Sequence, residues 1–275
     1  MKQLAIYIIG MVLLLAGCNN KENEARARYE KAKTFYEQND LFAAKNEIDS
    51  IRIYYPGVVK VMKDAIELKR QVELKEADRN IVFCDSLLPI RQEEAKVLNK
   101  NFTLEKDTVY QDIGNYVWKQ QTVERNVERS YIRCKVSEDG VMSLESVYFG
   151  NRPLNHTGIK VSLKDGTFAE TASIPYDGGL NYRFEDLGNT TEVVTYKGEN
   201  SVDAVKFIYS NAGERLKVEY TGGKAYTIYI SDADKKALVA TYDLAIVLSD
   251  IDTLTRERDK AIKRKAYLEN KLNQE

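Results

Sequence analysis

An unbroken heptad pattern near the C-terminus constrains the fold of this chain more than any other sequence feature. Apolar or long side chains recur at alternating spacings of four and three at Ala240, Leu244, Val247, Ile251, Leu254, Arg258, Ala261, Lys265, Leu268 and Leu272. Eight of the ten are apolar, which predicts a coiled-coil helix over about 232–275. Its apolar seam needs a partner, and the cheapest one is an antiparallel helix of the same chain.

Residues 25–56 carry the signature of two short helices. Small, large and helix-ending residues occupy Ala32, Phe35, Leu41, Ala44, Ile48, Ile51 and Pro56. This spacing resembles a single tetratricopeptide repeat, which implies a helical hairpin. Shifting by one period places Lys69 and Asp78 where the repeat needs apolar or small residues. We therefore expect one hairpin within a helical bundle and no peptide-binding array.

A long helix is predicted next, from about Val58 to Leu98. Its apolar residues, called here the Val58 stripe, are Val58, Val61, Ala65, Leu68 and Val72. The stripe is the expected partner of the C-terminal seam. Pro89 is expected to break or kink this helix, because proline lacks an amide hydrogen.

Between these helices the apolar period changes to two, which indicates strands. We expect strands over Val205–Tyr209, Arg215–Tyr220 and Ala225–Ile230, joined by turns at Asn211–Glu214 and Thr221–Lys224. About nine or ten strands are expected from Asn115 to Ile230. Short connections predict an antiparallel meander, closed as a sandwich or an open barrel. Trp118 is expected in the core.

These patterns predict an α+β fold. It comprises an N-terminal helical hairpin and long helix (25–100), a central antiparallel β-sheet domain (105–230), and a C-terminal coiled-coil helix (232–275) that packs back on the N-terminal helices. A lipoprotein signal peptide (1–17) and a tether (18–24) are expected before them.

The signal peptide is predicted from its composition. Lys2 precedes an apolar run from Leu4 to Leu15, and small residues follow. That run is short for a membrane span, which needs about 20 residues, although an uncleaved membrane helix is the alternative. Leu15-Ala16-Gly17-Cys18 resembles the bacterial lipobox. The resemblance implies cleavage before Cys18 and its modification with fatty acids such as palmitate, a stable membrane anchor.

The residues after Cys18 bear on location. The resemblance to Gram-negative lipoproteins implies the outer membrane, because Asn19 replaces the aspartate that retains enterobacterial lipoproteins at the inner membrane. Lys21-Glu22-Asn23-Glu24 weakly resembles a surface-display tag, but we prefer to explain it as the first turn of a helix, where acidic residues favour the positive end of the dipole. We therefore expect an outer membrane lipoprotein, on the periplasmic face or the cell surface.

Charge and motifs exclude several classes of function. The net charge is −1 and no basic run occurs, so no nucleic-acid partner is expected. No P-loop, dinucleotide fingerprint, nucleophile elbow or zinc-protease helix is present. A catalytic triad or a histidine-based metal site would need His156, the single histidine, which we expect on a surface loop. No metal or cofactor is expected.

Two further cysteines, Cys84 and Cys134, remain after Cys18. We expect two separately buried thiols. The alternative is a disulfide, which would close a loop of about 50 residues and contribute about 3–4 kcal/mol.

Two weaker patterns carry alternatives. Asp177 and Glu185 have aromatic neighbours and could serve a glycan hydrolase, which needs paired carboxylates, although turn chemistry explains Asp177 more simply.

Ser50, Ser86, Thr108 and Thr253 each follow an aspartate and precede an aliphatic residue. They resemble O-glycosylation acceptors of exported proteins in one Gram-negative lineage, and helix capping is the alternative.

The sequence favours a non-enzymatic, lipid-anchored cell-envelope protein. Its role is structural or in protein interaction, through the coiled coil and the β domain, with an envelope protein as partner. A surface module that binds glycan or peptide through its tyrosines is the first alternative. A glycan hydrolase that uses carboxylates near Asp177 and Glu185 is the second.

Overall fold

The computed structural model describes residues 2–273, with side chains from residue 20 onward. The chain forms two compact units. The helical unit comprises Met1–Ser86 and Arg256–Glu275, and the β unit comprises Leu87–Thr255. Both boundaries fall inside long helices, α3 (Val59–Asn99) and α5 (Asp232–Leu272). The α+β class predicted from the sequence is confirmed.

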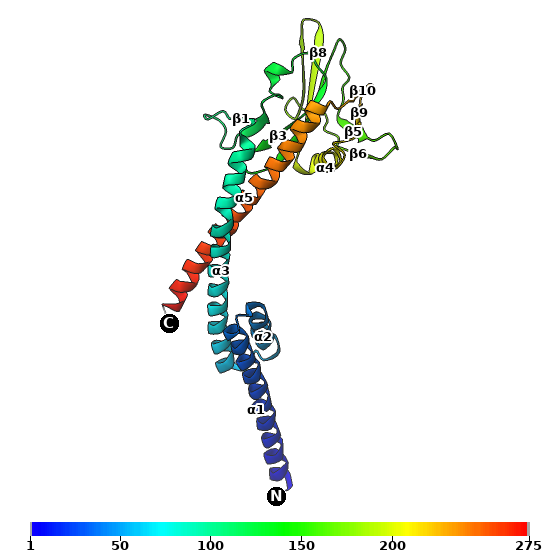
Figure 1. Ribbon diagram of the computed structural model, residues 1–275. Coiled ribbons are helices and arrows are strands. Elements are labelled where there is room, and N and C mark those ends of the chain that lie inside the picture. The colour runs from blue at the N-terminus through cyan, green and yellow to red at the C-terminus, as the bar shows by residue number, and fades with distance from the viewer. Residues whose placement is uncertain (1, 274–275) are drawn as a thin grey trace. The chain divides into compact units, whose positions relative to one another are not determined.

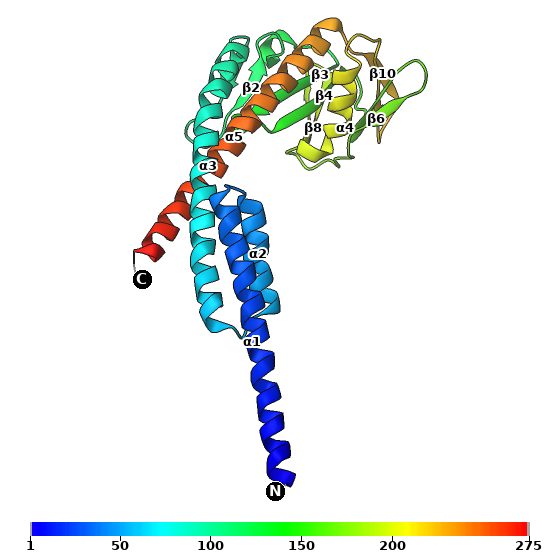
Figure 2. The ribbon, with the colours of Figure 1, turned by 60° about the horizontal axis from the view of Figure 1, so that its bottom comes forward.

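The helical unit begins with the predicted hairpin, formed by α1 (Lys2–Glu37) and α2 (Leu41–Tyr54). Asn39 adopts a positive φ of 69° in the turn, and the Asp40 side chain caps α2 by accepting the Ala43 amide at 3.0 Å. Figure 2 shows α1, α2 and the first part of α3 side by side. Their shared core contains Ala25, Ala32, Leu41, Ala44, Ile48, Ile51, Val61, Ala65, Leu68 and Val72.

The α5 helix packs against α3, and the predicted antiparallel direction is confirmed. Within the helical unit, Arg258 pairs with Asp85, and Lys265 Nζ lies 2.6 Å from Asp78 Oδ1. The partner surface was predicted wrongly, because the Val58 stripe packs in the core with α1 and α2. A different face of α3 meets α5, through charged pairs in the helical unit and, in the β unit, through Ala95 and Leu98, which pack with the cluster that contains Leu244. A knobs-into-holes coiled coil stays a prediction.

Pro89 does not interrupt α3, which runs without a break to Asn99. A proline inside a helix removes one backbone hydrogen bond and costs about 3 kcal/mol. Packing of α3 on both sides of Pro89, by the buried Cys84 and the partly buried Leu98, offsets that loss. The expected helix break was therefore wrong, and a kink at Pro89 stays a prediction.

Ten strands form two antiparallel sheets in the described chain (Figure 1). The six-stranded sheet has the order β1-β2-β3-β4-β8-β7 and the four-stranded sheet the order β10-β9-β5-β6. The strands are β1 (Phe102–Glu105), β2 (Asn115–Trp118), β3 (Tyr131–Ser137), β4 (Met142–Gly150), β5 (Gly158–Ser162), β6 (Phe168–Glu170), β7 (Asn181–Asp186), β8 (Asn189–Lys197), β9 (Lys217–Thr221) and β10 (Tyr226–Tyr229). Nine of these lie within Asn115–Ile230, as expected, but the path is no simple meander, because β5 and β6 leave the first sheet between β4 and β8.

One predicted strand is a helix. Residues Val205–Tyr209 belong to α4 (Val202–Ser210), which follows the short 3-10 helix η2 (Gly198–Asn200) and contacts β5 and β6. Ala204, Val205 and Ile208 are buried on one helical face, and the short apolar run fitted either period. The turn expected at Asn211–Glu214 therefore joins a helix to β9, whereas Thr221–Lys224 does join β9 to β10.

The two sheets share one core, which corresponds to the sandwich alternative. Leu144, Val194 and Tyr196 of the six-stranded sheet pack with Val161 and Val218 of the four-stranded sheet. We call the side of the six-stranded sheet that meets this core its inner face and the opposite side its outer face. Trp118 is buried, as predicted, in a second cluster that includes Phe102 and α5 residues such as Leu244.

In the part of the chain that the structure describes, no helix combines the length and the apolar character needed to cross a membrane.

Two isoleucines on α2 test the helical core. Ile51 is fully buried, whereas Ile53 is 62% exposed. Ile51→Ala should lower the free energy of unfolding by about 2–5 kcal/mol, and Ile53→Ala by about 0.5 kcal/mol or less. Chemical denaturation of both variants measures this. Equal losses would contradict the packing of α2 against α1 and α3.

Candidate functional site

An apolar groove lies on the outer face of the six-stranded sheet. Its floor is formed by Tyr131, Val147 and Val193, three buried residues from adjacent strands β3, β4 and β8. One wall is the segment around the 3-10 helix η1 (Val123–Arg125), and the other is the β7–β8 hairpin. We call this depression, of about 180 Å³, the outer-face groove.

Strand alternation explains how the groove and an ion cluster share this face. Every second residue of β3 points outward, so Tyr131 is followed on the outer face by Arg133 and Lys135. Both cations pair with Glu145 of β4, and the Arg133 Nε–Glu145 Oε2 distance is 2.7 Å. Burial by itself raises the pKa of Glu145, but the two cations outweigh it and leave the pKa lowered. The charged cluster therefore borders the apolar floor along β3 and β4.

Large apolar side chains remain exposed on both walls. Val127 is 69% exposed, Phe184 52% and Leu187 91%. Leu187 and Gly188 have φ values of 47° and 79°, which form the tight turn of the hairpin. A left-handed conformation costs a leucine about 1 kcal/mol or more, and such strain concentrates at functional positions. An exposed, strained leucine beside an apolar groove therefore indicates a contact surface.

A wider depression of about 470 Å³ lies between the β3–β4 hairpin, α4 and α5. It adjoins a tight structural contact, because a Cβ on Gly140 would lie 2.3 Å from the Ser249 backbone nitrogen. Its acidic neighbour Asp250 pairs with Arg91 at 3.0 Å. We take the outer-face groove as the candidate site, because exposed apolar residues and backbone strain coincide there.

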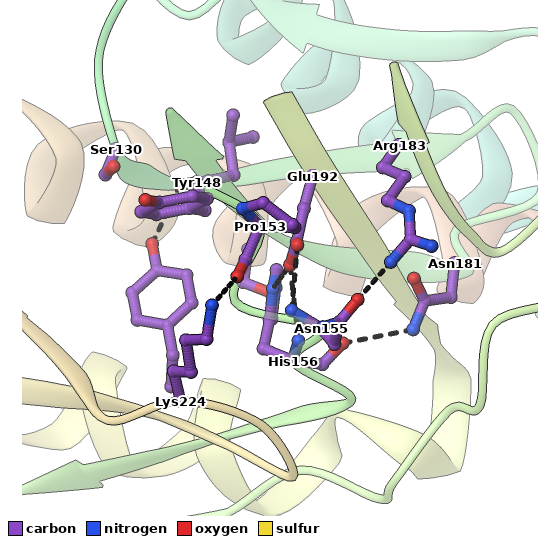
Figure 3. A network of polar contacts seen from close by, with 12 residues as sticks. Ser130, Tyr148, Pro153, Asn155, His156, Asn181, Arg183, Glu192 and Lys224 are labelled. Carbon is purple, nitrogen blue, oxygen red and sulfur yellow. Dashed lines mark hydrogen bonds and ion pairs between the residues drawn. The ribbon is translucent and has the colours of Figure 1, made fainter. Parts of the chain in front are cut away.

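Directly beneath the groove, on the inner face, lies a buried polar network centred on His156 (Figure 3). His156 Nδ1 lies 2.8 Å from Glu192 Oε2, and its Nε2 lies 2.9 Å from Ser146 Oγ. Ser146 Oγ in turn lies 3.0 Å from Tyr196 Oη. Burial raises the pKa of Glu192, but hydrogen bonds from the His156 ring and from the Asn155 and His156 amides outweigh it, and the pKa is lowered. A carboxylate only accepts hydrogen bonds, so Nδ1 carries the proton that is donated to Glu192.

This network holds the loop that crosses from one sheet to the other. The loop joins β4 of the six-stranded sheet to β5 of the four-stranded sheet. Glu192 of β8 accepts the Asn155 amide at 2.8 Å, and Asn181 of β7 donates to the His156 carbonyl at 3.1 Å. On the other side, the His156 ring packs edge-on against Tyr220 of β9, with centroids 4.9 Å apart. The crossing loop is therefore bound to both sheets.

The β9–β10 turn closes over the same loop. The Lys224 amide donates to the Leu154 carbonyl at 2.9 Å, and Lys224 Nζ donates to the Pro153 carbonyl at 3.2 Å. A Cβ on Gly223 would lie 2.1 Å from the Leu154 oxygen, so only glycine permits this approach.

Ser146, His156 and Glu192 follow the serine–histidine–carboxylate order of a nucleophilic site. All three are buried, and none lines the groove or the wider depression. Acyl transfer needs a substrate atom within about 3 Å of the nucleophile and of oxyanion donors. The arrangement is therefore a structural network in this conformation. The expectation that His156 lies on a surface loop was wrong, because the loop runs between the sheets.

The two further cysteines lie on different elements and do not form a disulfide. Cys84 on α3 and Cys134 on β3 are both free and buried, and burial raises the pKa of the Cys134 thiol well above its usual value. A neutral buried thiol is a poor nucleophile. The side chain of Cys18 lies outside the side chains that the structure describes.

The two carboxylates of the hydrolase alternative do not converge. Asp177 Oδ1 accepts the Gly179 and Asn181 amides at 2.8 and 2.9 Å, and the backbone bond from Asn181 is the main cause of its lowered pKa. Glu185 lies four residues further along β7 than Asn181, roughly 13 Å at the usual rise per residue. Asp177 therefore serves turn chemistry.

The four candidate acceptor hydroxyls lie in different settings. Ser50, Ser86 and Thr253 lie on α2, α3 and α5, and Thr108 lies in the exposed loop between β1 and β2. Ser50 and Ser86 donate back to their own helices, to the Asn46 carbonyl at 2.8 Å and the Phe83 carbonyl at 2.7 Å.

Among the described residues, no group of three or more histidine, cysteine, aspartate or glutamate side chains could hold a metal ion. Comparison with known proteins finds no protein-family model that matches the chain, no similar curated protein and no similar solved structure.

Ser146, Glu192 and the floor of the groove were not predicted from the sequence. A signal was present for the floor and for Glu192. Val147-Tyr148-Phe149 and Val193-Val194 place apolar residues on both faces of a strand, which predicts burial on both sides. Glu192, Val194 and Tyr196 are alternate residues of one strand and therefore point to the same face. Because Val194 and Tyr196 are apolar or aromatic, Glu192 is a charged residue on the face that points inward.

Glu192→Gln tests the buried network. The folded pKa of Glu192 lies below the unfolded value of about 4.3, so its stabilising contribution is complete above that value and is lost as pH falls through the folded pKa. The variant should lose about 1–3 kcal/mol of unfolding free energy at neutral pH, and the difference from wild type should shrink below about pH 4.

Unfolding in denaturant across this pH range measures the difference. Glu105→Gln, on an exposed carboxylate of β1, is the matched control and should change stability little at any pH. If the loss of unfolding free energy in Glu192→Gln stayed constant down to about pH 3, this would contradict the role of Glu192 as a carboxylate with a lowered pKa in the network.

Proposed function

We propose that this chain is a non-enzymatic, lipid-anchored envelope protein that binds a partner protein through the outer-face groove of its β unit. The observation that carries the proposal is the groove itself, a concave apolar floor on the outer face of the six-stranded sheet, with exposed Val127, Phe184 and Leu187 on its walls. Contiguous exposed apolar residues of this kind mark interaction sites. Acylation of Cys18 would hold the protein at the outer membrane, on its periplasmic face or at the cell surface.

The size of the groove favours a protein partner. Sites for small molecules have volumes of roughly 300–1,000 Å³, and the groove has about 180 Å³. A cavity of about 150 Å³ accommodates one benzene ring, so the groove suits one aromatic or aliphatic side chain from a partner. Single anchors of this kind in desolvated pockets contribute much of the binding energy at protein interfaces.

The glycan-binding alternative is less well supported. A sugar site needs accessible aromatic faces. Tyr148, Tyr196 and Tyr220 of the sheets are buried in the core, and Tyr229 of β10, which is 51% exposed, lies outside the groove. Only Tyr131 and Tyr182 line the groove, and the Tyr131 ring is covered by Arg129, whose guanidinium carbon lies 4.3 Å from the ring centroid.

The anchor is tested by metabolic labelling. Cells grown with radioactive palmitate should label the wild-type chain, and Cys18→Ser should abolish the label, because the acyl chains need this sulfur and its new amino terminus. Cys84→Ser is the matched control and should keep the label. Equal labelling of wild type and Cys18→Ser would end the anchor proposal.

The groove is tested by photo-crosslinking in the envelope. A photoreactive residue at Val127, on one wall, should give a discrete protein adduct. Leu187→Asn on the opposite wall should reduce that adduct. This variant keeps the fold, because asparagine before Gly188 suits the positive-φ turn and should stabilise the chain by about 0.5–1 kcal/mol.

The control position is Val109, which is 77% exposed and lies outside the groove. The same adduct from Val109, or an adduct from Val127 that Leu187→Asn leaves unchanged, would contradict binding through the groove.

A further inference from the structure

The outer edge of β7 is open for pairing. β7 is a terminal strand of the six-stranded sheet, and Arg183, Phe184, Glu185 and Asp186 are exposed. Charged residues on such strands usually prevent edge-to-edge pairing. On β7, however, the order of the charged residues favours pairing with one particular partner, a second copy of the same strand.

The hydrogen bonds with β8 fix which backbone groups of β7 point outward. The Thr195 amide donates to the Leu180 carbonyl at 2.7 Å, so residues 180, 182, 184 and 186 bond to β8 by antiparallel alternation. Residues 181, 183 and 185 therefore direct their amides and carbonyls away from the sheet. The Asp177 loop occupies those of Asn181, which leaves Arg183 and Glu185 for a further strand.

We propose that two copies of the chain pair in antiparallel orientation through β7, with a two-fold axis at Phe184. Arg183 then lies opposite the partner's Glu185, and Glu185 opposite the partner's Arg183. These are the residues whose backbone groups point outward, so the hydrogen-bonding pattern and the charge pattern require the same register. Opposite charges directly across a strand pair are stabilising.

Side chains on the outer face match in the same register. Phe184 meets the partner's Phe184, and Tyr182 lies opposite the partner's Asp186, a phenol donor facing a carboxylate acceptor. The pairing covers Phe184, which is 52% exposed in the single chain.

Neighbouring registers are unfavourable. A shift that keeps outward-facing residues opposite each other places Arg183 against the partner's Arg183, or Glu185 against the partner's Glu185. Like charges directly opposite are destabilising. The Arg183 guanidinium already donates to Asn155 Oδ1 and lies over the Tyr176 ring, 5.1 Å from its centroid. It has five N–H donors, so it can bind the partner's Glu185 as well.

This dimer goes beyond the proposed function and would change how the outer-face groove binds its partner. Antiparallel edge pairing keeps the outer faces of both copies on the same side of one continuous sheet. The two outer-face grooves would then open toward the same partner surface, on either side of the Phe184 pair. Two linked sites raise apparent affinity without any new contact in either groove.

Disulfide trapping of the purified full-length chain in detergent tests the register. Residues at 184 would form a non-hydrogen-bonded pair with Cα atoms about 4.5 Å apart, which a disulfide can bridge. Phe184→Cys should crosslink into dimers under mild oxidation. Leu187→Cys is the control, because position 187 is more exposed but would lie roughly 20 Å from its own copy. The wild-type chain sets the background from Cys18, Cys84 and Cys134.

Charge exchange and sedimentation equilibrium complete the test without any partner protein. Arg183→Glu or Glu185→Arg alone should weaken dimerisation at least about tenfold, and the double exchange should restore it to within about threefold. The restoration separates an ion pair between copies from a folding defect.

A wild-type chain that stays monomeric at about 100 μM would overturn the proposal. So would crosslinking of Leu187→Cys as efficient as that of Phe184→Cys, or a double exchange that fails to restore a dimer. Each of these results is independent of the Val127 adduct, so failure of the dimer and failure of the groove are distinguishable.

Discussion

The contact between His156 Nδ1 and Glu192 Oε2, 2.8 Å long, joins the loop that leaves the six-stranded sheet to β8, an interior strand of that sheet. The chain has to cross from β4 to β5 through a buried layer, where unpaired polar groups are costly. His156 supplies a ring that reaches Ser146 on one side and Glu192 on the other, and an edge that packs on Tyr220. The polar groups of the crossing loop are therefore hydrogen-bonded within the core, and the loop is bound to both sheets.

This arrangement separates the two faces of the six-stranded sheet by role. The inner face carries the shared core and its polar network. The outer face carries the groove, whose apolar floor at Val147 and Val193 is bordered by the Arg133–Glu145–Lys135 cluster. A sheet fixed from its inner side can present a preformed groove, which reduces the entropy cost of binding. The proposed binding on the outer face and the proposed pairing along β7 would both use this edge of the sandwich.

Periodicity predicted much of the fold, because long patterns average over many residues. The heptads from Ala240 to Leu272 predicted α5, and the small and large residues from Ala32 to Ile51 predicted the α1–α2 hairpin. Short runs were ambiguous, so Val205–Tyr209 fitted a strand and forms α4. The face of α3 that meets α5 was not predicted, because the apolar Val58 stripe was assigned to α5 and packs with α1 and α2 instead. The buried network was missed because Glu192 lies 36 residues from His156 in the sequence, and only the fold brings the two together.

The single histidine gives a direct measurement of the central contact. In a chain labelled with ¹⁵N-histidine, every imidazole signal comes from His156. We expect one imidazole tautomer with a persistent Nδ1–H resonance that exchanges with solvent no faster than the buried strand amides, and loss of that protection in Glu192→Gln. A ring proton that exchanges freely at neutral pH, or an average of both tautomers in the wild-type chain, would contradict it.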